Sequence, residues 1–157
     1  MKELSIPALD QLPQLIWKEK LAFLTYKFLQ QHQTECPLEH IFEPGVYIRE
    51  LRIPAGTLFI GRVHRHGHRV DLLAGSVVHI TEAGKREICA PFSVTTTGGD
   101  QMVFYALTNI VGRSFHPNPS ESRDAQALED DAFESVESLK ALGLSVDQKM
   151  EQLTWQA

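Results

Sequence analysis

The sequence has few cysteines and no long apolar run, and both shortages limit what the protein can be. No window approaches the ~18 apolar residues that a membrane span needs, and the opening MKELSIPALD lacks the apolar run of a signal peptide. Cys36 and Cys89 have no metal-type spacing, and one possible pair in 157 residues is no disulfide framework. We therefore expect a soluble protein that is not exported. We expect both cysteines to be small buried residues in a reducing compartment.

Positive charge is also scarce, and nowhere is it concentrated. The chain carries 15 Lys and Arg against 20 Asp and Glu, which gives a formal net charge of −5. Most of the acidic excess lies from residue 117 onward. No stretch gathers enough cations to follow a phosphate backbone, so we expect no nucleic-acid binding. The acidic run Glu129-Asp130-Asp131 predicts a solvated helix end, with a docking surface for a basic partner as the alternative.

Helical periodicity is confined to the two ends of the chain. Near the start, a helix over residues 13–33 is predicted, with Pro13 in its first turn, because apolar residues recur at helical spacing. These apolar residues are Trp17, Leu21, Leu24 and Phe28. Near the end, a second helix is predicted to stop at Gly143, and a last short helix to start at Ser145. The apolar residues of the second helix are Phe133, Val136, Leu139 and Leu142.

Between these ends the period of the apolar residues changes to two. Short β-rich runs follow one another, bounded by Gly, Pro and acidic turns, with no helical segment between them. Gly84 can take a positive φ in a hairpin turn. The predicted strands cover residues 46–53, 57–64, 69–75, 76–82, 86–90, 92–97, 101–110 and 111–116. Strands this short and closely spaced predict a mainly β protein, an antiparallel sandwich or barrel.

The length and this order of elements indicate one compact core. A chain of this size should bury roughly 68–70% of its unfolded surface. We expect a helical arm over residues 1–40, a β-barrel over residues 41–116 and an acidic helical tail over residues 117–157. Each helical part carries an apolar stripe that a single sandwich leaves partly uncovered, so a homo-oligomer is predicted.

Three of the seven histidines lie in one short segment, Arg62-Val63-His64-Arg65-His66-Gly67-His68. Alternate side chains of a strand share a face, so the even-numbered residues would project one way, with Cβ atoms roughly 6.5 Å apart. Imidazoles at i and i+2 can meet on one ion, and a bend at Gly67 could bring in a third. On the earlier strand, Tyr47 and Arg49 face one side and Glu50 the other, which makes no ready acid/base pair.

Two interpretations of the histidine segment stay open. The first is one divalent metal ion, Zn, Fe, Mn or Ni, inside the barrel. Its predicted ligands are His64, His66 and His68, completed by His116 or His79. The second is a polar interior without an ion, in which imidazoles hydrogen-bond to one another, to Asp71 or to water. Arg62 favours the second, because a fixed cation in a ligand position repels a metal.

The spacing of this segment resembles the first motif of the cupin superfamily. That motif reads Gly, five residues, His-x-His, three or four residues, Glu, six residues, Gly. The matching positions are Gly56, Arg62, His64, His68 and Gly75. Arg therefore stands where the motif has its first His, and His where it has Glu. The second cupin motif falls on residues 97–102, where Gly99 is kept and Met102 takes the position of the ligand His.

A closer resemblance covers about residues 40–131. It includes the run HIFEPGVYIRELRIPAGTLFIGRVHRHGH and the ending FHPNPSESRDAQALEDD. These runs are similar to the small single-domain cupins encoded in bacteriophage and prophage genomes. The resemblance implies a cupin-like jelly roll with an N-terminal helix and C-terminal helices, and a phage origin.

Three functions are compatible with these features. The resemblance and the altered metal motif favour a structural or interaction module, namely a virion or virion-assembly component that docks on other phage structural proteins. The alternative is a metal-dependent cupin enzyme, a dioxygenase, isomerase or sugar-modifying enzyme, whose catalytic residues the sequence leaves unknown. The third is a non-catalytic binder of a small ligand, with Arg62 and Met102 among the ligand-binding residues. The first places the protein in the virion, and the others place it in the host cytoplasm.

Overall fold

The computed structural model describes residues 15–155, and they fall into two compact units. Residues Thr34–Ser135 form one unit, which holds all the strands. Helices α2 (Trp17–Leu29) and α4 (Val136–Trp155) belong to the other. In the described part of the chain, none of the helices combines the length and the apolar character that a membrane span requires.

The helical unit is held together by close packing of α2 against α4. Gly143 lies so near the Ala22 carbonyl oxygen and Tyr26 Cβ that a side chain there would collide with both. Lys27 Nζ on α2 forms an ion pair of 2.9 Å with Asp147 on α4. The prediction that Gly143 ends a helix is therefore wrong. Its missing side chain lets two helices approach, and α4 continues through it.

Helix α2 is shorter than the predicted helix over residues 13–33. It begins at Trp17, where the backbone N–H of Ile16 donates to Glu19 Oε1 (3.3 Å), and it ends at Leu29. The predicted apolar stripe is confirmed at Leu21 and Leu24, which are both buried. Pro13 lies outside the described residues.

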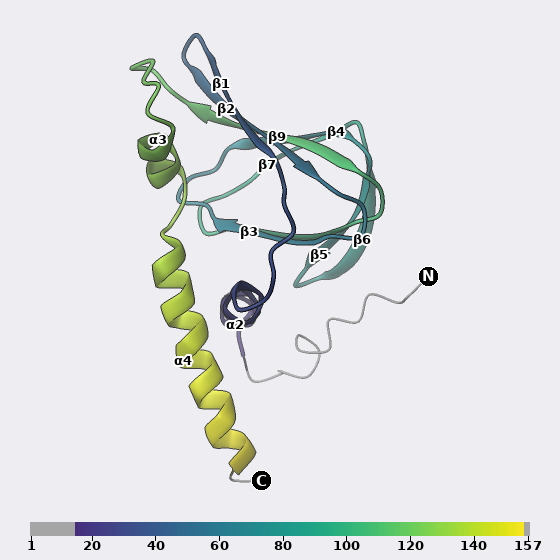
Figure 1. Ribbon diagram of the computed structural model, residues 1–157, viewed down its shortest axis with the longest axis vertical. Coiled ribbons are helices and arrows are strands. Elements are labelled where there is room, and N and C mark those ends of the chain that lie inside the picture. Colours follow the sequence, from purple (N-terminus) through teal and green to yellow (C-terminus); the bar gives the residue numbers. More distant parts are fainter. Residues whose placement is uncertain (1–14, 156–157) are drawn as a thin grey trace. The chain divides into compact units, whose positions relative to one another are not determined.

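The strand unit is a two-sheet antiparallel sandwich (Figure 1). One sheet has the order β1-β2-β9-β4-β7 and the other has the order β3-β8-β5-β6. Without β1, the two sheets have four strands each, in the orders β2-β9-β4-β7 and β3-β8-β5-β6. Two four-stranded antiparallel sheets in these orders form a cupin-like jelly roll. The strand bounds are β1 Leu38–Glu43, β2 Val46–Ile53, β3 Leu58–Val63, β4 Arg69–Ala74, β5 Ser76–Thr81, β6 Gly84–Cys89, β7 Phe92–Thr95, β8 Gln101–Ala106 and β9 Ile110–Pro117. The mainly β fold predicted from the sequence is confirmed.

Details at the edges of the sheets differ from the sequence-based prediction. Strand β1 was not predicted, because its burial does not alternate, yet it pairs with β2 along its whole length. The hairpin at Gly84 is confirmed, with φ of +132°. Cys36 packs on the core but is only partly buried, and Cys89 is exposed, so the expectation that both cysteines are buried is wrong for Cys89 and only partly met at Cys36. Cys89 lies on the edge strand β6, in which the neighbouring Ile88 is the only buried residue.

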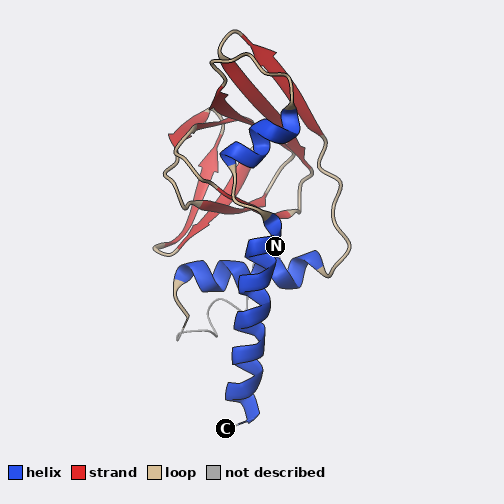
Figure 2. Cartoon of the chain, turned by 90° about the vertical axis from the view of Figure 1, so that its left-hand side faces the viewer, coloured by secondary structure: helices blue, strands red, loops and turns tan. Residues whose placement is uncertain are grey.

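A short helix, α3 (Ala125–Ala132), follows the last strand (Figure 2). Asp124 caps it by accepting a hydrogen bond from the Ala127 N–H (3.1 Å). The prediction that Phe133 begins the next helical stripe is wrong, because its backbone is extended and forms an antiparallel bridge with His64. The α3 segment therefore closes against the end of β3 and places Phe133 within the strand unit.

Candidate functional site

Three buried histidines meet inside the sandwich. His64 follows the end of β3, His68 precedes β4, and His116 lies on β9; each is at most 6% exposed. The ring centroids of His64 and His68 are 4.2 Å apart, and those of His68 and His116 are 4.4 Å apart. Three of the four predicted ligands, His64, His68 and His116, therefore lie together. His66 does not lie with them, because strand β3 ends at Val63 and His66 lies exposed on the turn before β4.

The turn that separates His64 from His68 depends on Gly67 and Thr96. A side chain at residue 67 would collide with the Thr96 carbonyl oxygen, so only Gly fits there. The Thr96 hydroxyl lies 3.0 Å from His64 Nδ1, and it accepts a hydrogen bond from the His68 backbone N–H (3.1 Å). The turn thus brings the two imidazoles together, with centroids 4.2 Å apart, instead of spacing them along one strand face.

Burial keeps these imidazoles neutral. It lowers the pKa of His116 to about 3, with His68 and Arg49 adding to the effect. It lowers the pKa of His64 to about 4, again with His68 contributing. The pKa of His68 is lowered as well, mainly by burial. A cluster of neutral rings can donate and accept hydrogen bonds near neutral pH.

Phe133 covers one side of the histidine cluster. Its ring centroid lies 5.5 Å from those of His64 and His116, and 5.9 Å from that of His68. The guanidinium carbons of Arg49 and Arg62 lie 4.8 Å and 5.1 Å from the same centroid, within cation–π range. Phe133 therefore contacts both the three imidazoles and the two guanidiniums.

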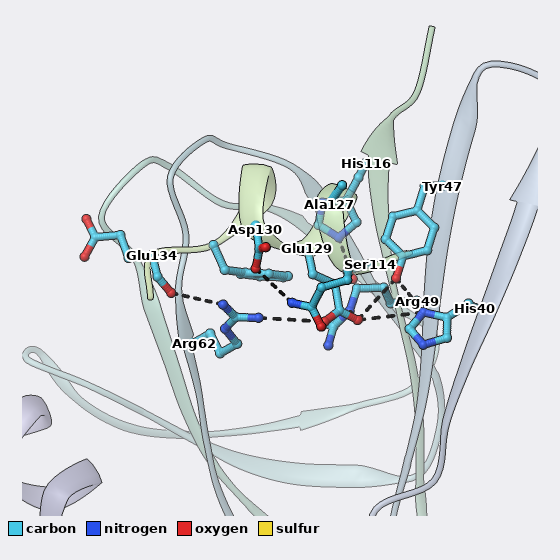
Figure 3. Close-up of polar contacts among 12 residues, drawn as sticks. His40, Tyr47, Arg49, Arg62, Ser114, His116, Ala127, Glu129, Asp130 and Glu134 are labelled. Carbon is cyan, nitrogen blue, oxygen red and sulfur yellow. Dashed lines mark hydrogen bonds and ion pairs between the residues drawn. The ribbon is translucent and has the colours of Figure 1, made fainter. Parts of the chain in front are cut away.

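Glu129 of α3 lies between these two arginines, as Figure 3 shows. Its Oε1 is 3.4 Å from Arg49 Nε, and its Oε2 is 3.8 Å from Arg62 Nη1. The Tyr47 hydroxyl is also 3.4 Å from Oε1 and 2.6 Å from His40 Nδ1. Burial and Glu129 raise the pKa of Tyr47 to about 12, so it stays protonated. The prediction that Glu129 is a solvated helix end is wrong, because its side chain is only 15% exposed and faces this cluster.

A cavity of about 380 Å³ lies between the sheets, and its lining includes Arg49, Arg62, His64, His68 and Phe133 but not Glu129 or His116. Its inward-facing side chains change from polar to apolar along the central strands. Strand β2 presents Arg49, Leu51 and then Ile53, paired on β9 with Ser114, Gly112 and Ile110. His68, Val70 and Leu72 repeat this order at β4. The other predicted site residues on the wall are Arg62, His79 and Met102.

Two buried nitrogens at the polar end lack hydrogen-bond partners. Within residues 15–155, Arg62 Nε and His68 Nε2 are the buried side-chain nitrogen and oxygen atoms without one. Both residues line the cavity. Leaving a buried polar atom unsatisfied costs about 1–3 kcal/mol, so a ligand whose polar group pairs with these nitrogens would be stabilised at this end.

The histidine cluster as described does not fit a metal ion. The imidazole planes are tilted by 42° and 51° to one another at centroid distances of 4.2 Å and 4.4 Å, and Arg49 adds positive charge beside them. Over the described part of the chain, no group of three or more His, Cys, Asp or Glu is arranged to hold a metal. The ligand set of His64, His66, His68 and His116 stays a prediction from the sequence.

No protein-family model and no curated protein sequence matches the chain. Solved structures match parts of it at low identity. A cupin domain from Bordetella pertussis is 19% identical, with a TM-score of 0.43, over 56% of this chain and 98% of that one. Ectoine synthase from P. lautus is 16% identical, with a TM-score of 0.46, over 55% and 67%. A cupin superfamily protein from Desulfitobacterium hafniense is 7% identical, with a TM-score of 0.46, over 59% and 85%. These similarities concern the fold alone.

Proposed function

We propose that the protein is a small-molecule binding module whose barrel takes an amphiphilic ligand. The observation that carries the proposal is the cavity, which is apolar at one end and holds two unsatisfied nitrogens at the other. Its volume of about 380 Å³ lies in the range of small-molecule sites. The apolar body of the ligand would lie on the barrel core, and a polar head group would meet Arg62 and His68.

The length of the inward face limits the size of the ligand. Arg49 and Ile53 are four positions apart on β2, and a strand rises about 3.3 Å per residue, so the wall is ~13 Å long between them. The deep end is lined by side chains of the core cluster, which are Leu51, Ile53, Phe59, Leu72, Val77, Ile88, Phe92, Phe104 and Ile110. An extended chain of about eight carbons with a polar head fits this length, so octanamide is a suitable neutral probe.

A calorimetric titration of octanamide tests the proposal when Gly112→Leu is measured beside the wild type. Gly112 lines the cavity, and the nearest atom to a Cβ there is the Asp71 carbonyl oxygen at 3.6 Å, so a leucine would enter the cavity without a backbone clash. The neighbouring Val111 faces the other side of β9, which makes Val111→Leu the matched control. We expect binding to the wild type and to Val111→Leu, and loss of binding in Gly112→Leu. Equal binding by all three proteins would place the ligand elsewhere and refute the proposal.

A second proposal concerns assembly. Leu29 of α2 and Leu144 of α4 are 40% exposed, and Ile16 is 64% exposed, so the helical unit presents apolar side chains that a second copy could cover. We propose a homo-oligomer through this unit, which is also what a virion-assembly component would need. Leu29→Glu with Leu144→Glu should lower the native mass measured by light scattering, with Lys18→Glu as the control. An unchanged native mass would refute it.

The metal-dependent enzyme remains the alternative from the sequence. It predicts stoichiometric Fe, Mn, Ni or Zn in protein purified without an affinity tag. The binding proposal requires no metal, so elemental analysis beside the titration separates the two.

A further inference from the structure

We infer that the polar head of the ligand is a carboxylate, and that it takes the place that Glu129 holds between Arg49 and Arg62. The inference rests on the proposed function and adds the chemical class of the ligand. Glu129 then acts as an internal surrogate that the ligand displaces.

The first reason is the charge at the polar end of the cavity. Arg49 and Arg62 each carry a fixed positive charge, with side chains 19% and 26% exposed. Within residues 15–155, Glu129 is the carboxylate that forms ion pairs with either guanidinium. One carboxylate against two guanidiniums leaves one positive charge uncompensated. A buried excess charge is costly, so a ligand with one negative charge is favoured over a neutral one.

The second reason is that Glu129 holds the two arginines loosely. Its contacts of 3.4 Å and 3.8 Å are longer than the ~2.7–2.9 Å of a well-formed charged hydrogen bond. Arg62 Nε, which could complete a bidentate pair, has no partner, while Arg62 Nη2 donates to the Glu134 carbonyl oxygen (3.2 Å). A free carboxylate in the cavity could use the donors that Glu129 leaves unpaired, because a guanidinium presents them in a planar fork.

The third reason is that displacement requires little change in the backbone. The segment after Glu129 is fixed by backbone contacts with the end of β3. The Arg65 N–H donates to the Ala132 carbonyl oxygen (2.9 Å), and the Glu134 N–H donates to the Val63 carbonyl oxygen (2.8 Å). These bonds hold Phe133 in place whether or not Glu129 is engaged. Rotation of the Glu129 side chain alone would open the anion position.

The test compares octanoate with octanamide, which differ in charge but are nearly equal in shape. Wild-type protein should bind octanoate about tenfold more tightly, because charge-assisted hydrogen bonds contribute more than neutral ones. Glu129→Gln keeps the shape of the side chain and removes the competing charge. It should raise the affinity for octanoate about tenfold and change that for octanamide by less than about twofold. A gain in affinity cannot come from misfolding.

Asp130→Asn is the control for this variant, because Asp130 is the next acid on α3 and its side chain contacts Gln126 of the same helix. It should leave both affinities unchanged. Arg62→Gln should lower the affinity for octanoate about tenfold, and Arg52→Gln, on the outer face of β2, should not.

Two results would overturn the inference while the proposed function stands. One is equal binding of octanoate and octanamide, both lost in Gly112→Leu. The other is tighter binding of octanoate that Glu129→Gln leaves unchanged or weakens. If neither probe binds the wild type, the proposed function fails and the inference fails with it.

Discussion

Lowering the pH from about 7.5 to about 5 should destabilise the protein through its buried histidines. In the unfolded chain an imidazole takes up a proton near its ordinary pKa of about 6.5. In the folded chain the pKa of His64 is about 4 and that of His116 is about 3, mainly because of burial. Protons therefore bind first to the unfolded chain. The stability that the neutral rings confer is complete above about pH 6.5 and is lost as the pH falls toward the folded-state values.

The size of the effect depends on the unfolded chain in this pH range. At about pH 5 both rings are neutral when folded and almost fully protonated when unfolded. This pH lies about 1.5 pH units below the ordinary pKa, and each unit corresponds to ~1.4 kcal/mol. The free energy of unfolding therefore falls by ~2 kcal/mol for each ring and by ~4 kcal/mol for the two. Burial also lowers the pKa values of His68 and His79, and these groups add to the loss. Such a loss is a large part of the ~5–15 kcal/mol that stabilises a typical protein.

The carboxylates that form ion pairs contribute little to the change in stability between about pH 7.5 and about pH 5. Arg113 lowers the pKa of Glu50, and Arg69 lowers that of Asp71, so both contribute stability above the ordinary carboxyl values of 4.5 and 3.8. Their contribution has the same sign but is lost only as the pH falls through the still lower folded-state pKa values. The interval between about pH 7.5 and about pH 5 therefore reports on the histidines.

Urea unfolding followed by far-ultraviolet circular dichroism measures the effect. The free energy of unfolding should fall by at least ~4 kcal/mol between the two pH values, and His116→Gln should reduce the fall by ~2 kcal/mol. His66→Gln replaces an exposed imidazole outside the cluster and is the control for the substitution itself; it should leave the free energy of unfolding at about pH 7.5 unchanged. A wild-type free energy that stays constant to about pH 5, or a His116→Gln variant with the full loss, would refute the reasoning.

Three further substitutions test other parts of the structure. Phe133→Ala should lower the free energy of unfolding in urea by ~3–5 kcal/mol, because the ring is 3% exposed and contacts the three imidazoles; a loss below ~1 kcal/mol would contradict this packing. Gly143→Ala should lower the melting temperature, because its Cβ would meet Ala22 and Tyr26; helix propensity alone predicts a gain of ~1 kcal/mol, so a rise would contradict the close approach. Met102→His adds an imidazole to the wall that holds His64 and His68 and should strengthen Zn²⁺ or Ni²⁺ binding in calorimetry; no gain would mean that the second cupin motif is misplaced.

Eight of the nine strands that the structure describes, all but β1, could be located from the sequence, because a period of two with Gly and Pro boundaries marks each run, although most ends differ by one to four residues. The run from Val46 to Ile53 was predicted with the bounds of β2. The helical end was harder, because Gly143 and Phe133 carry local signals that tertiary packing overrides. In the sequence Gly143 predicts a helix end, but in the structure it allows α4 to approach α2 closely. Phe133 fits an apolar stripe, yet it covers the histidine cluster.

The site was only partly predictable for the same reason. His64 and His68 were found by their spacing. The turn at Gly67 that brings them together and leaves His66 outside the cluster depends on contact with Thr96. Glu129 lies 80 positions from Arg49, so no local pattern could join them. One signal was present. The alternation of β2 places Arg49 on the inward face beside Leu51, and a buried cation needs an acid from elsewhere in the chain.

The most direct test of the central claim locates the probe inside the barrel. Intermolecular nuclear Overhauser effects between octanoate and methyl-labelled full-length protein report which methyl groups lie against its alkyl chain. We predict contacts with Val77, Ile88 and Ile110, whose side chains line the deep end of the cavity. Contacts confined to Leu24 and Leu29 of α2, or no contacts with the cavity methyl groups at saturating octanoate, would contradict the proposal that the jelly roll holds the ligand.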